Sequence, residues 1–594
     1  MPARRARGSI ASIAALALVV AVAALGVLDV ANFYLARRSL QNVADLAALA
    51  AVQQMDDACQ QPPITAAANA ASNGFTVSST QTLSTVCGRW DSSGSGMAFT
   101  QASNPPTAAQ LPLNGAEVTV TRLVPYFFVG PAHEVSAVAT AQATNTDSFS
   151  LSTTLVQADL LNGLLSGLLG TSVNLSLASW SGLANTTISL GDLVAQANAG
   201  TVDGLLNTNV TVAQLAQLMA NVLQKQAVTD ANASAALGAL NTILSANIPG
   251  TTSFALGNRP NAPGLLSLGL ADSNAALDAT ISPLQALIVG AEIAQTGQPP
   301  IGLNVNLNNL TGGLGTLPAS LQLAVQIVEP PSIGVGQPGY IPGTTTWRTV
   351  ASTAQILVLL NVGLGTSSLT VNIPILGSLI NFLTQAVDVS VQLPVYLTVA
   401  PAQAWLTSIQ CAPTAAASVI NIGAQTGLLN LCIGQAPTGL NSTQAFSCGT
   451  PATIANVALA GQPVATVTAA LPLEASVPAA DAVTLSFDGN GNPLGSNSTN
   501  ANQLGPLLSA TLSDTSQALL QGNALNVSLL GSQSIPAGPL VGFVGSVLTT
   551  LLTPVLDTLS TALIAPLLQL LGVQVGVATV TPSPAVCGVA QLVK

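Results

Sequence analysis

The sequence predicts an α+β protein in which an amino-terminal transmembrane helix continues into a long helix, followed by antiparallel-sheet regions with Leu- and Ala-rich helices. Three observations predict this fold class. A charge-free apolar run of 21 residues, 8–28, leads into a segment with no Pro or Gly up to Gln61. Apolar and β-branched runs then follow between Gly, Ser, Asn and Pro residues, as strands do. Other segments have the three-to-four-residue apolar spacing of helices.

The apolar run predicts a membrane anchor. As a helix it would be roughly 30 Å long, about the thickness of the hydrocarbon layer of a bilayer. Arg4, Arg5 and Arg7 precede the run and favour a cytoplasmic amino terminus. The alternative is a removable signal peptide with Ala21 to Ala23 as the cleavage site. We favour the retained anchor because the run continues unbroken past Ala23 to Leu28.

The segment after the anchor predicts a helix with a narrow seam of mostly small residues. The seam positions step by three or four residues: Val30, Phe33, Arg37, Leu40, Ala44, Ala47 and Ala51. Small residues permit close packing against another helix, which would make the seam a partner contact. Alternatively, the seam docks on the protein's own first domain. The sequence leaves both interpretations open.

The charge content argues against a nucleic-acid partner, and the aromatic content predicts which residues form the hydrophobic cores. Only 6% of residues are charged, and the formal net charge is −11. Five of the eleven basic residues lie within the first 38 positions, so the remainder is acidic and would repel nucleic-acid phosphates. We therefore expect no nucleic-acid partner. Aromatic residues make up 3% of the chain, so the cores are expected to consist of Leu, Val, Ile and Ala.

The cysteines predict disulfide bonds in an oxidising compartment. There are six: Cys59, Cys87, Cys411, Cys432, Cys448 and Cys587. None forms a Cys-x-x-Cys pair and the chain has one His, which argues against zinc. Cys59 and Cys87 flank one small region and are expected to pair. The other four allow three connectivities, and the sequence does not choose among them.

The amino-terminal segment resembles a known family. Residues 4–51 read RRARGSIASIAALALVVAVAALGVLDVANFYLARRSLQNVADLAALAA. This string is similar to the start of TadG-like proteins of the Tad (Flp pilus) assembly system. The matching features are Gly8, Asp29, the pair Arg37 and Arg38, Leu40 to Asn42, Ala44 with Asp45, and the alanines at 47–51. Ile13 stands where pilins of related systems carry Glu, so the resemblance does not imply processing into a filament.

The resemblance implies a single-pass inner-membrane protein with most of its chain in the periplasm. It also implies contacts with other pilus-assembly or pseudopilin-like proteins. The residues expected to contact the membrane or a partner helix are Gly8, Asp29, Phe33, Arg37, Arg38, Leu40, Ala44, Asp45, Ala47 and Ala51. A turn at Gly88–Asp91 is a further shared feature, and residues 328–339 and 397–411 bear a weaker likeness to carboxy-terminal regions of these proteins.

The chain divides into five expected regions. Residues 1–30 hold the cytoplasmic start and the transmembrane helix, and residues 31–148 form the exit helix with a small, pilin-like α+β unit. Residues 149–345 are helix-rich, with helices expected at 212–226, at 232–246 behind Asp230 as a cap, and at 273–295 with an interruption at Pro283. Residues 346–450 are β-rich and contain Cys411, Cys432 and Cys448. Residues 451–594 are mixed, with apolar helices at 539–571 and terminal strands.

Four patterns suggest chemistry, but each has a structural explanation that we favour. Gly334 to Gly339 fits a dinucleotide fingerprint, yet the surrounding prolines predict a loop without a following helix. Asp91 to Ser95 fits a metal-dependent adhesion loop, and Asp488 to Asn492 offers calcium ligands; both are expected to be turns. His133 is expected at the surface where a strand begins. There is no Walker loop and no G-x-S-x-G motif.

We therefore expect no catalytic, metal-binding, cofactor-binding or nucleotide-binding site. The predicted function is a non-enzymatic, membrane-anchored component of a Tad/Flp-type pilus assembly system. The alternative is a secreted or surface-exposed adhesin, released after Ala23 or binding through a metal at Asp91.

Overall fold

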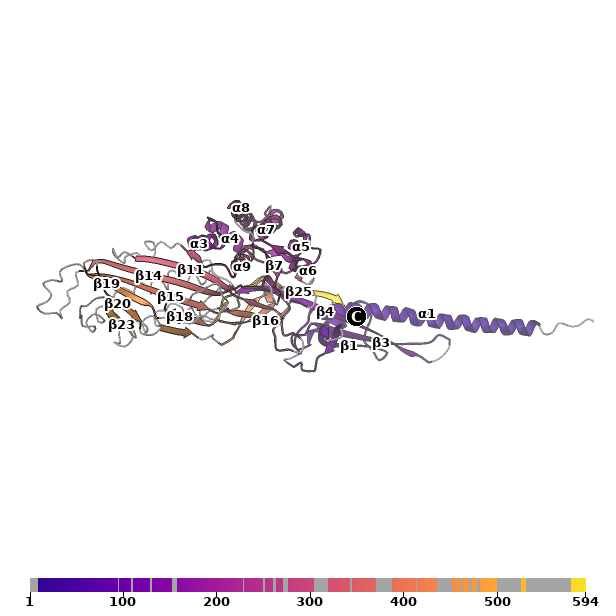
Figure 1. Ribbon diagram of the computed structural model, residues 1–594. Helices are drawn as coiled ribbons and strands as arrows, with labels where there is room; N and C mark the ends of the chain where they lie inside the picture. The colour runs from indigo at the N-terminus through magenta and orange to yellow at the C-terminus, as the bar shows by residue number, and fades with distance from the viewer. Residues whose placement is uncertain are drawn as a thin grey trace, which may run out of the picture.

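The computed structural model describes residues 9–593 apart from several gaps. The gaps are 94–95, 108–109, 129–130, 152–157, 228, 249–251, 260–262, 271–275, 304–318, 342–343, 370–386, 413, 435–450, 460–461, 470–472, 478–480, 499–524 and 530–577. Gly8, Cys448 and the helices expected at 539–571 lie outside the described residues. The molecule is elongated: helix α1 projects at one end, a long sheet forms the other, and a helical lobe lies to one side between them (Figure 1).

Helix α1 is a single unbroken helix, Ser9–Gln53, of 45 residues. At 1.5 Å per residue it is about 68 Å long, more than twice the hydrocarbon thickness of a bilayer. The predicted continuation of the anchor into an exit helix is therefore confirmed. A short helix, α2 (Gln61–Ser72), follows and ends at Asn73 and Gly74, where Gly74 adopts the left-handed φ of +79° that terminates the helix.

The second half of α1 packs on the first part of a sheet that holds ten strands within the described residues. Its strands run in the order β2 (Gly96–Gln101), β1 (Gln81–Ser93), β3 (Gly115–Val124), β4 (His133–Leu151), β12 (Ile333–Gly336), β8 (Gly264–Gly269), β7 (Phe254–Gly257) and β6 (Asn209–Val210), and β4 also pairs with β24 (Val580–Pro582) and β25 (Val586–Leu592). The β12–β8 and β7–β8 pairs are parallel and the other pairs are antiparallel.

Strand β4 joins two parts of this sheet. Its first half pairs with β3, from His133 opposite Val124 to Gln142 opposite Gly115. Gln142 also pairs with Gln591 of β25, so β3 and β25 lie on opposite edges of β4. Further along, Phe149 pairs with both β12 and β24. The boundary expected at residue 148 therefore falls inside one continuous strand, and the two regions that it would separate share a backbone ladder.

The helical lobe covers residues 158–295, and its core, which includes the fully buried Trp180, is continuous with buried side chains of strands further along the chain, such as Val358 and Leu397. Its helices are α3 (Ala158–Leu169), α4 (Leu177–Asn185), α5 (Leu190–Gln196), α6 (Val202–Leu206), α7 (Val212–Gln226), α8 (Ala231–Ser245) and α9 (Pro283–Gln295), and a two-stranded sheet, β5 (Ile188–Ser189) with β9 (Thr280–Ile281), lies among them. The predicted helix at 212–226 is confirmed residue for residue, with a capping box between Thr211 and Gln214. Asp230 caps α8 as predicted, accepting hydrogen bonds from the N–H groups of Asn232 and Ala233.

The helix expected at 273–295 is corrected. Residues 271–275 lie outside the described residues, and Thr280–Ile281 is a strand; the helix begins only at Pro283. Proline suits the first turn of a helix because its missing N–H would have no partner there. Pro283 therefore starts α9 and does not interrupt a longer helix.

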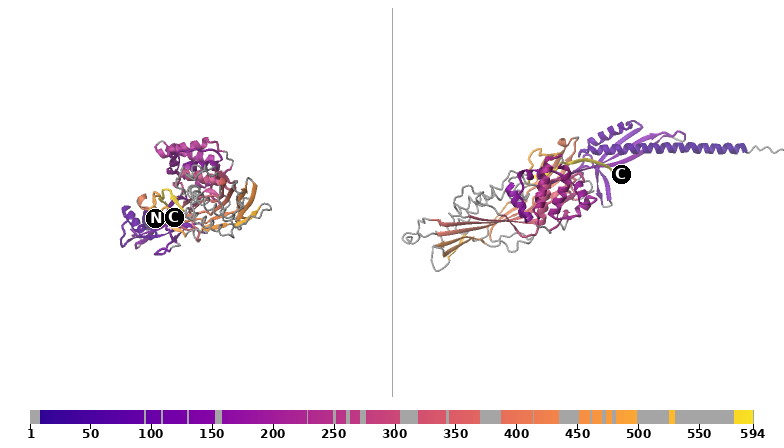
Figure 2. Two further views of the ribbon diagram at one scale, coloured as in Figure 1. Left: turned by 90° about the vertical axis from the view of Figure 1, so that its left-hand side faces the viewer. Right: turned by 90° about the horizontal axis from the view of Figure 1, so that it is seen from above.

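Two further sheets follow in the second half of the chain. The nine-stranded sheet forms the distal end in Figures 1 and 2. Seven of its strands run in the order β10 (Ile301–Leu303), β11 (Ala319–Glu329), β14 (Gln355–Leu369), β15 (Val387–Val399), β19 (Thr453–Leu459), β20 (Gln462–Ala469) and β23 (Leu525–Leu529). The other two are β18 (Leu429–Ile433), which pairs with β15, and β21 (Leu473–Val477), which pairs with β18. The four-stranded sheet contains β13 (Val350–Ser352), β16 (Gln403–Gln410), β17 (Val419–Gln425) and β22 (Val483–Asp488). The predicted α+β class, with an amino-terminal apolar helix and antiparallel sheets, is confirmed.

Disulfides hold the ends of the chain to the fold. Cys59 pairs with Cys87 as predicted, tying the segment after α1 to β1. Of the three connectivities left open, the structure selects the one that contains Cys411–Cys587. This bond joins the end of β16 to β25, across 176 residues of sequence. Cys432 is also disulfide-bonded.

The core of the helical lobe contains a buried carboxyl group on α9. Glu292 is 1% exposed, and its Oε1 atom has no hydrogen-bond partner among the described residues. Burial raises the pKa of Glu292 well above its usual range because the charged form loses its hydration. In the unfolded chain the same group ionises above about pH 4.3.

We expect Glu292→Gln to stabilise the lobe at neutral pH. The contribution of Glu292 to stability is fully present below its unfolded pKa and is lost as the pH rises toward its higher folded pKa. Glutamine does not titrate, so the variant should lose less stability between about pH 4 and pH 7.5, with a melting temperature about 2–4 °C higher at the upper end. Circular dichroism melts at both pH values measure this, with the exposed Asp278→Asn as control. Equal pH dependence in wild type and Glu292→Gln would contradict it.

Candidate membrane anchor and interdomain junction

The first half of α1 presents an apolar surface with almost no contact to the rest of the protein. The helix from Ser12 to Gln53 contains an 18-residue window with a mean hydropathy of 2.6, of which 6% is buried. Its large exposed side chains are Ile13, Leu16, Leu18, Val19, Val20, Val22, Val27 and Leu28. Exposing apolar area to water costs about 25 cal/mol per Å², whereas a bilayer interior matches it. By length and composition, this helix can span a membrane.

At Asp29 the helix meets the rest of the molecule. Asp29 is 2% exposed, and its Oδ1 atom accepts a hydrogen bond of 2.8 Å from the backbone N–H of Phe127, in the segment between β3 and β4. Asn32 donates to the carbonyl of Pro125 at 3.5 Å. The ring of Phe33 lies 4.7 Å from that of Tyr126, between centroids. These contacts fasten the start of the exit helix to the end of the β3–β4 hairpin.

The second half of α1 docks on the protein's own sheet. Leu40, Ala44, Ala47 and Ala51 have no exposed area and belong to the same core as Ala137, Ala139, Ala141 and Ala143, which share one face of β4. Small side chains on both surfaces let the helix approach the sheet closely. Of the two interpretations of the seam, the structure supports docking on the first domain for these four residues, which are not available to a partner.

The remaining predicted contact residues differ in exposure. Arg37 and Arg38 are exposed, and Phe33 is half-buried. Asp45 accepts a hydrogen bond of 2.7 Å from Gln41, whose amide also donates to the carbonyl of Val138. Asp45 therefore helps to orient a side chain that reaches β4.

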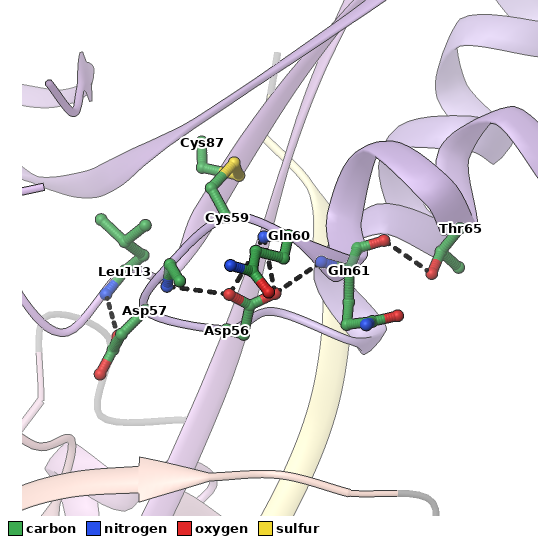
Figure 3. The surroundings of a disulfide bond; sticks show 9 residues. Asp56, Asp57, Cys59, Gln60, Gln61, Thr65, Cys87 and Leu113 are labelled. Atoms are coloured by element: carbon green, nitrogen blue, oxygen red, sulfur yellow. Dashed lines mark hydrogen bonds between the residues drawn. A yellow bond between two sulfur atoms is a disulfide. The ribbon is translucent and has the colours of Figure 1, made fainter. Parts of the chain in front are cut away.

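Two adjacent carboxylates organise the loop that carries the Cys59–Cys87 disulfide (Figure 3). Asp56 accepts hydrogen bonds from the backbone N–H groups of Ala58, Gln60 and Gln61, which fixes the path into α2. Asp57 accepts one of 3.0 Å from Leu113. Burial raises the pKa of Asp57, and the Leu113 hydrogen bond opposes that rise.

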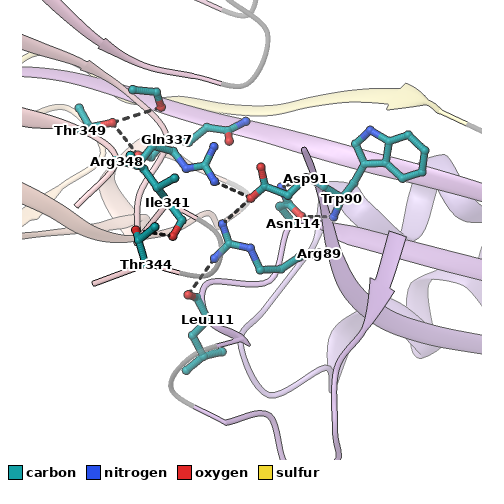
Figure 4. A network of polar contacts seen from close by, with 11 residues as sticks. Arg89, Trp90, Asp91, Leu111, Asn114, Gln337, Ile341, Thr344, Arg348 and Thr349 are labelled. Atoms are coloured by element: carbon teal, nitrogen blue, oxygen red, sulfur yellow. Dashed lines mark hydrogen bonds and ion pairs between the residues drawn. The ribbon is translucent and has the colours of Figure 1, made fainter. Parts of the chain in front are cut away.

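The first domain is joined to the second half of the chain by a buried ion-pair network. The Asp91 carboxylate lies between the guanidinium groups of Arg89, at 3.0 Å, and Arg348, which precedes β13 and is 257 residues away (Figure 4). Arg89 also donates to the carbonyl of Leu111. The side chains of Arg348 and Asp91 are 6% and 9% exposed. Burial lowers the pKa of Arg89, and the charge of Asp91 opposes that shift.

This network gives Asp91 a structural role. Strands β1 and β2 pair as a hairpin with Asp91 opposite Ala98, so Asp91 to Ser93 of the turn expected at Asp91 to Ser95 lie in β1, and residues 94–95 lie outside the described residues. The turn expected at Gly88–Asp91 is wrong, because these residues lie inside β1. Sequence reasoning also missed the ion pair. The low charge content could have indicated it. In a chain with 6% charged residues, a charged residue beside a buried strand is expected to have a partner.

The other three suggestive patterns also have structural roles. Asp488 accepts hydrogen bonds from the N–H groups of Asn490 and Asn492 and from the Asn492 side chain, which lower its pKa and close the predicted turn after β22. Gly491 adopts a φ of +86° there. His133 is exposed at the start of β4, as predicted, with its ring 6.2 Å from that of Phe33. No group of three or more His, Cys, Asp or Glu residues suited to a metal occurs within the described residues.

The loop expected at Gly334 to Gly339 is corrected. Ile333–Gly336 forms β12, a fully buried strand between β4 and β8. A Cβ atom on Gly334 would come within 3.0 Å of the Phe149 ring, and one on Gly336 within 2.5 Å of the Gly269 carbonyl. The glycines therefore serve close strand packing. The flanking prolines predicted a loop, and the pairing partners were too distant in sequence to reveal the strand.

Comparison with protein families identifies three segments. Residues 8–54 match a family of TadE/G-like proteins of Flp pilus assembly (Tad), and residues 50–143 match a Tad-like Flp pilus-assembly family (Tad_C). Together these cover α1, α2, β1 to β3 and the first half of β4. Residues 157–292 match a domain of unknown function (DUF8293), which coincides with the helical lobe. No curated protein and no solved structure matches the chain. The resemblance predicted from residues 4–51 is thus confirmed.

We expect Asp91→Asn to destabilise the molecule strongly. The substitution leaves the buried guanidinium of Arg348 and the partly buried one of Arg89 without their ion pair, and breaking a buried pair typically costs about 3–5 kcal/mol. Denaturant unfolding of the purified full-length chain in detergent measures the loss. The exposed Asp481→Asn should change stability by no more than about 0.5 kcal/mol. If both variants unfold at the same denaturant concentration, the network does not hold the two regions together.

Proposed function

The amino-terminal region of this chain is TadG-like, and from this we propose that the protein is a membrane-anchored, non-enzymatic component of a Tad/Flp pilus assembly system. The single observation that supports this most is α1: one continuous helix has an exposed apolar half and a half that is buried in the chain's own sheet. In this proposal α1 crosses the inner membrane once, and the sheets and helical lobe lie in the periplasm.

Charge and disulfides support this orientation. Arg4, Arg5 and Arg7 precede the apolar run, as expected for a cytoplasmic start. The Cys59–Cys87 and Cys411–Cys587 disulfides lie on the other side of the run and persist in an oxidising compartment such as the periplasm. The opposite orientation would place both disulfides in a reducing cytoplasm.

The non-enzymatic part of the proposal rests on what the suggestive residues do. Asp91 neutralises two arginines, Asp488 closes a turn, and Gly334 and Gly336 permit close strand packing. Each side chain or glycine is thereby accounted for by the fold. The role that remains is mechanical or positional: to hold a large folded region at the membrane surface for other pilus-assembly proteins to contact.

Deleting the gene and counting surface pili by electron microscopy tests the assembly role. We expect loss of pili and of adherence, with both restored by the wild-type gene on a plasmid. Unchanged piliation in the deletion strain would overturn the proposal. Amino-terminal mass spectrometry of the mature chain separates it from the adhesin alternative: a start before the apolar run supports the anchor, and a start after Ala23 supports release.

We expect Leu16→Arg combined with Val20→Arg to abolish membrane retention. Both side chains are exposed in the middle of the apolar half, and each Arg raises the free energy of insertion by about 2.5–3.5 kcal/mol. Carbonate extraction of membranes, followed by immunoblotting, measures retention. The matched control, Leu16→Ile with Val20→Ile, should stay in the membrane pellet with the wild type. Finding the wild type itself in the carbonate supernatant would show that α1 is not a membrane span.

A further inference from the structure

The end of the β3–β4 hairpin lies beside α1 where its apolar half ends. We call the described residues Pro125 to Phe128 the hairpin tip. The tip contacts Asp29, Asn32 and Phe33, which follow directly after Leu28, the last residue of the apolar run. Strand β3 and the segment after it run along α1 toward its amino-terminal end in two perpendicular views (Figures 1 and 2). If α1 spans a bilayer, the tip is level with the bilayer surface.

The tip exposes aromatic side chains at this level. Phe127 and Phe128 are 63% and 53% exposed, and their ring centroids lie 6.3 Å apart. Tyr126 packs on Phe33, and Tyr34 of α1 is 68% exposed. Only 3% of the chain is aromatic, so five aromatic residues in one contact region are a strong local concentration. Aromatic residues are enriched at membrane–water interfaces, where the rings leave water and the polar groups stay hydrated.

The order of residue types along α1 follows the polarity profile of a bilayer surface. The apolar run ends at Leu28, the aromatic contacts lie at Phe33 and Tyr34, and the exposed Arg37 and Arg38 come one turn later. Side chains of a helix point toward its amino terminus, and arginine is long enough to reach back to lipid phosphates. This basic pair at the membrane side contrasts with the acidic remainder of the chain.

Asp29 explains why the tip is held at this place. A carboxylate at the edge of the apolar run would be costly without a partner. It is 2% exposed and accepts the N–H of Phe127, so the tip both shields and satisfies it. The same hydrogen bond positions Phe127 and Phe128 beside the helix.

We propose that the hairpin tip is a second membrane contact, in which Tyr126, Phe127 and Phe128 insert into the interfacial layer of the bilayer that α1 spans and are held there by Asp29. This inference rests on the proposed anchoring of α1. Phe127 and Phe128 are both more than half exposed, so their insertion removes further apolar area from water and holds the hairpin against the bilayer. The tip thereby gives the folded region a set orientation to the membrane.

Lipid quenching tests the proposal with the full-length chain. Single cysteines are introduced at Phe128→Cys, Val22→Cys and Leu46→Cys and labelled with a polarity-sensitive fluorophore, and each protein is reconstituted into phosphatidylcholine–phosphatidylglycerol nanodiscs containing brominated lipids. Val22 lies in the apolar half of α1, and Leu46 is exposed about 25 Å beyond Asp29 along the helix. We expect emission at 22 and at 128 to fall by about half, as for probes within roughly 5–10 Å of the acyl boundary, and emission at 46 to be unchanged.

The labels at 22 and 128 test the membrane anchor and the membrane contact of the tip separately. Quenching at 22 with none at 128 would overturn the membrane contact of the tip and leave the anchor intact. No quenching at 22 would overturn the anchor itself. If the label at 128 is unquenched by lipid but shifts to shorter wavelength as protein concentration rises, the aromatic residues contact a second copy of the chain, which also overturns the proposal.

A matched pair of variants tests the role of Asp29. Asparagine keeps an oxygen that can accept the Phe127 N–H, whereas leucine has a similar volume and no acceptor. With the label at 128, we expect Asp29→Asn to retain the wild-type quenching and Asp29→Leu to lose about half of it, because the unheld tip spends less time at the surface. Quenching at 22 should be the same in both. Equal quenching at 128 in the two variants would show that Asp29 does not hold the tip.

Discussion

The fold depends on the pairing of one long strand, β4, with partners from the beginning, the middle and the end of the chain. Its 19 residues pair with β3, then with β12, and on the opposite edge with β25 and β24. A backbone ladder of this kind leaves no hinge between the helix-bearing first domain and the sheets beyond it. The carboxy-terminal strands close the arrangement, and the Cys411–Cys587 disulfide fixes them to the four-stranded sheet.

Small residues in the core and the buried ion pair also hold the first domain rigidly against the sheets. The face of β4 that receives α1 is lined by alternating alanines, and four of the seven α1 residues in the same core are also alanines: Ala44, Ala47, Ala48 and Ala51. Backbones packed this closely tolerate little displacement, because even one added methylene disturbs a dense core. One buried ion pair links distant segments: Asp91 joins β1 to the segment before β13 through Arg348. Such a pair specifies a junction that small apolar residues alone would not specify.

Local features were predictable from the sequence and distant pairings were not. Helix α7 and the Asp230 cap follow from apolar spacing and capping residues, which act within a few positions. Cys59–Cys87 was predictable because few alternatives exist within one small region. The strand at Ile333–Gly336 and the Asp91–Arg348 pair depend on partners about 60 to 260 residues away, which no local pattern encodes. The seam on α1 could be predicted from the spacing of its residues, but the surface that it packs against could not. Small residues pack equally well against a helix of another protein and against an alanine-lined sheet.

The placement of Asp29 connects the anchor to this rigid body. An unbroken helix whose first half is exposed, and whose inward-facing Leu40, Ala44 and Ala47 are fully buried, transmits any tilt of its membrane segment to the sheet. A single helix would still allow rotation about its own axis. The hydrogen bond from Phe127 to Asp29 brings a second element to the helix at the exit point, displaced from the axis, and two separated contacts with one surface remove that rotation. Because β3 and β4 continue from this hairpin into the shared ladder, the orientation set at the membrane extends to the distal sheet.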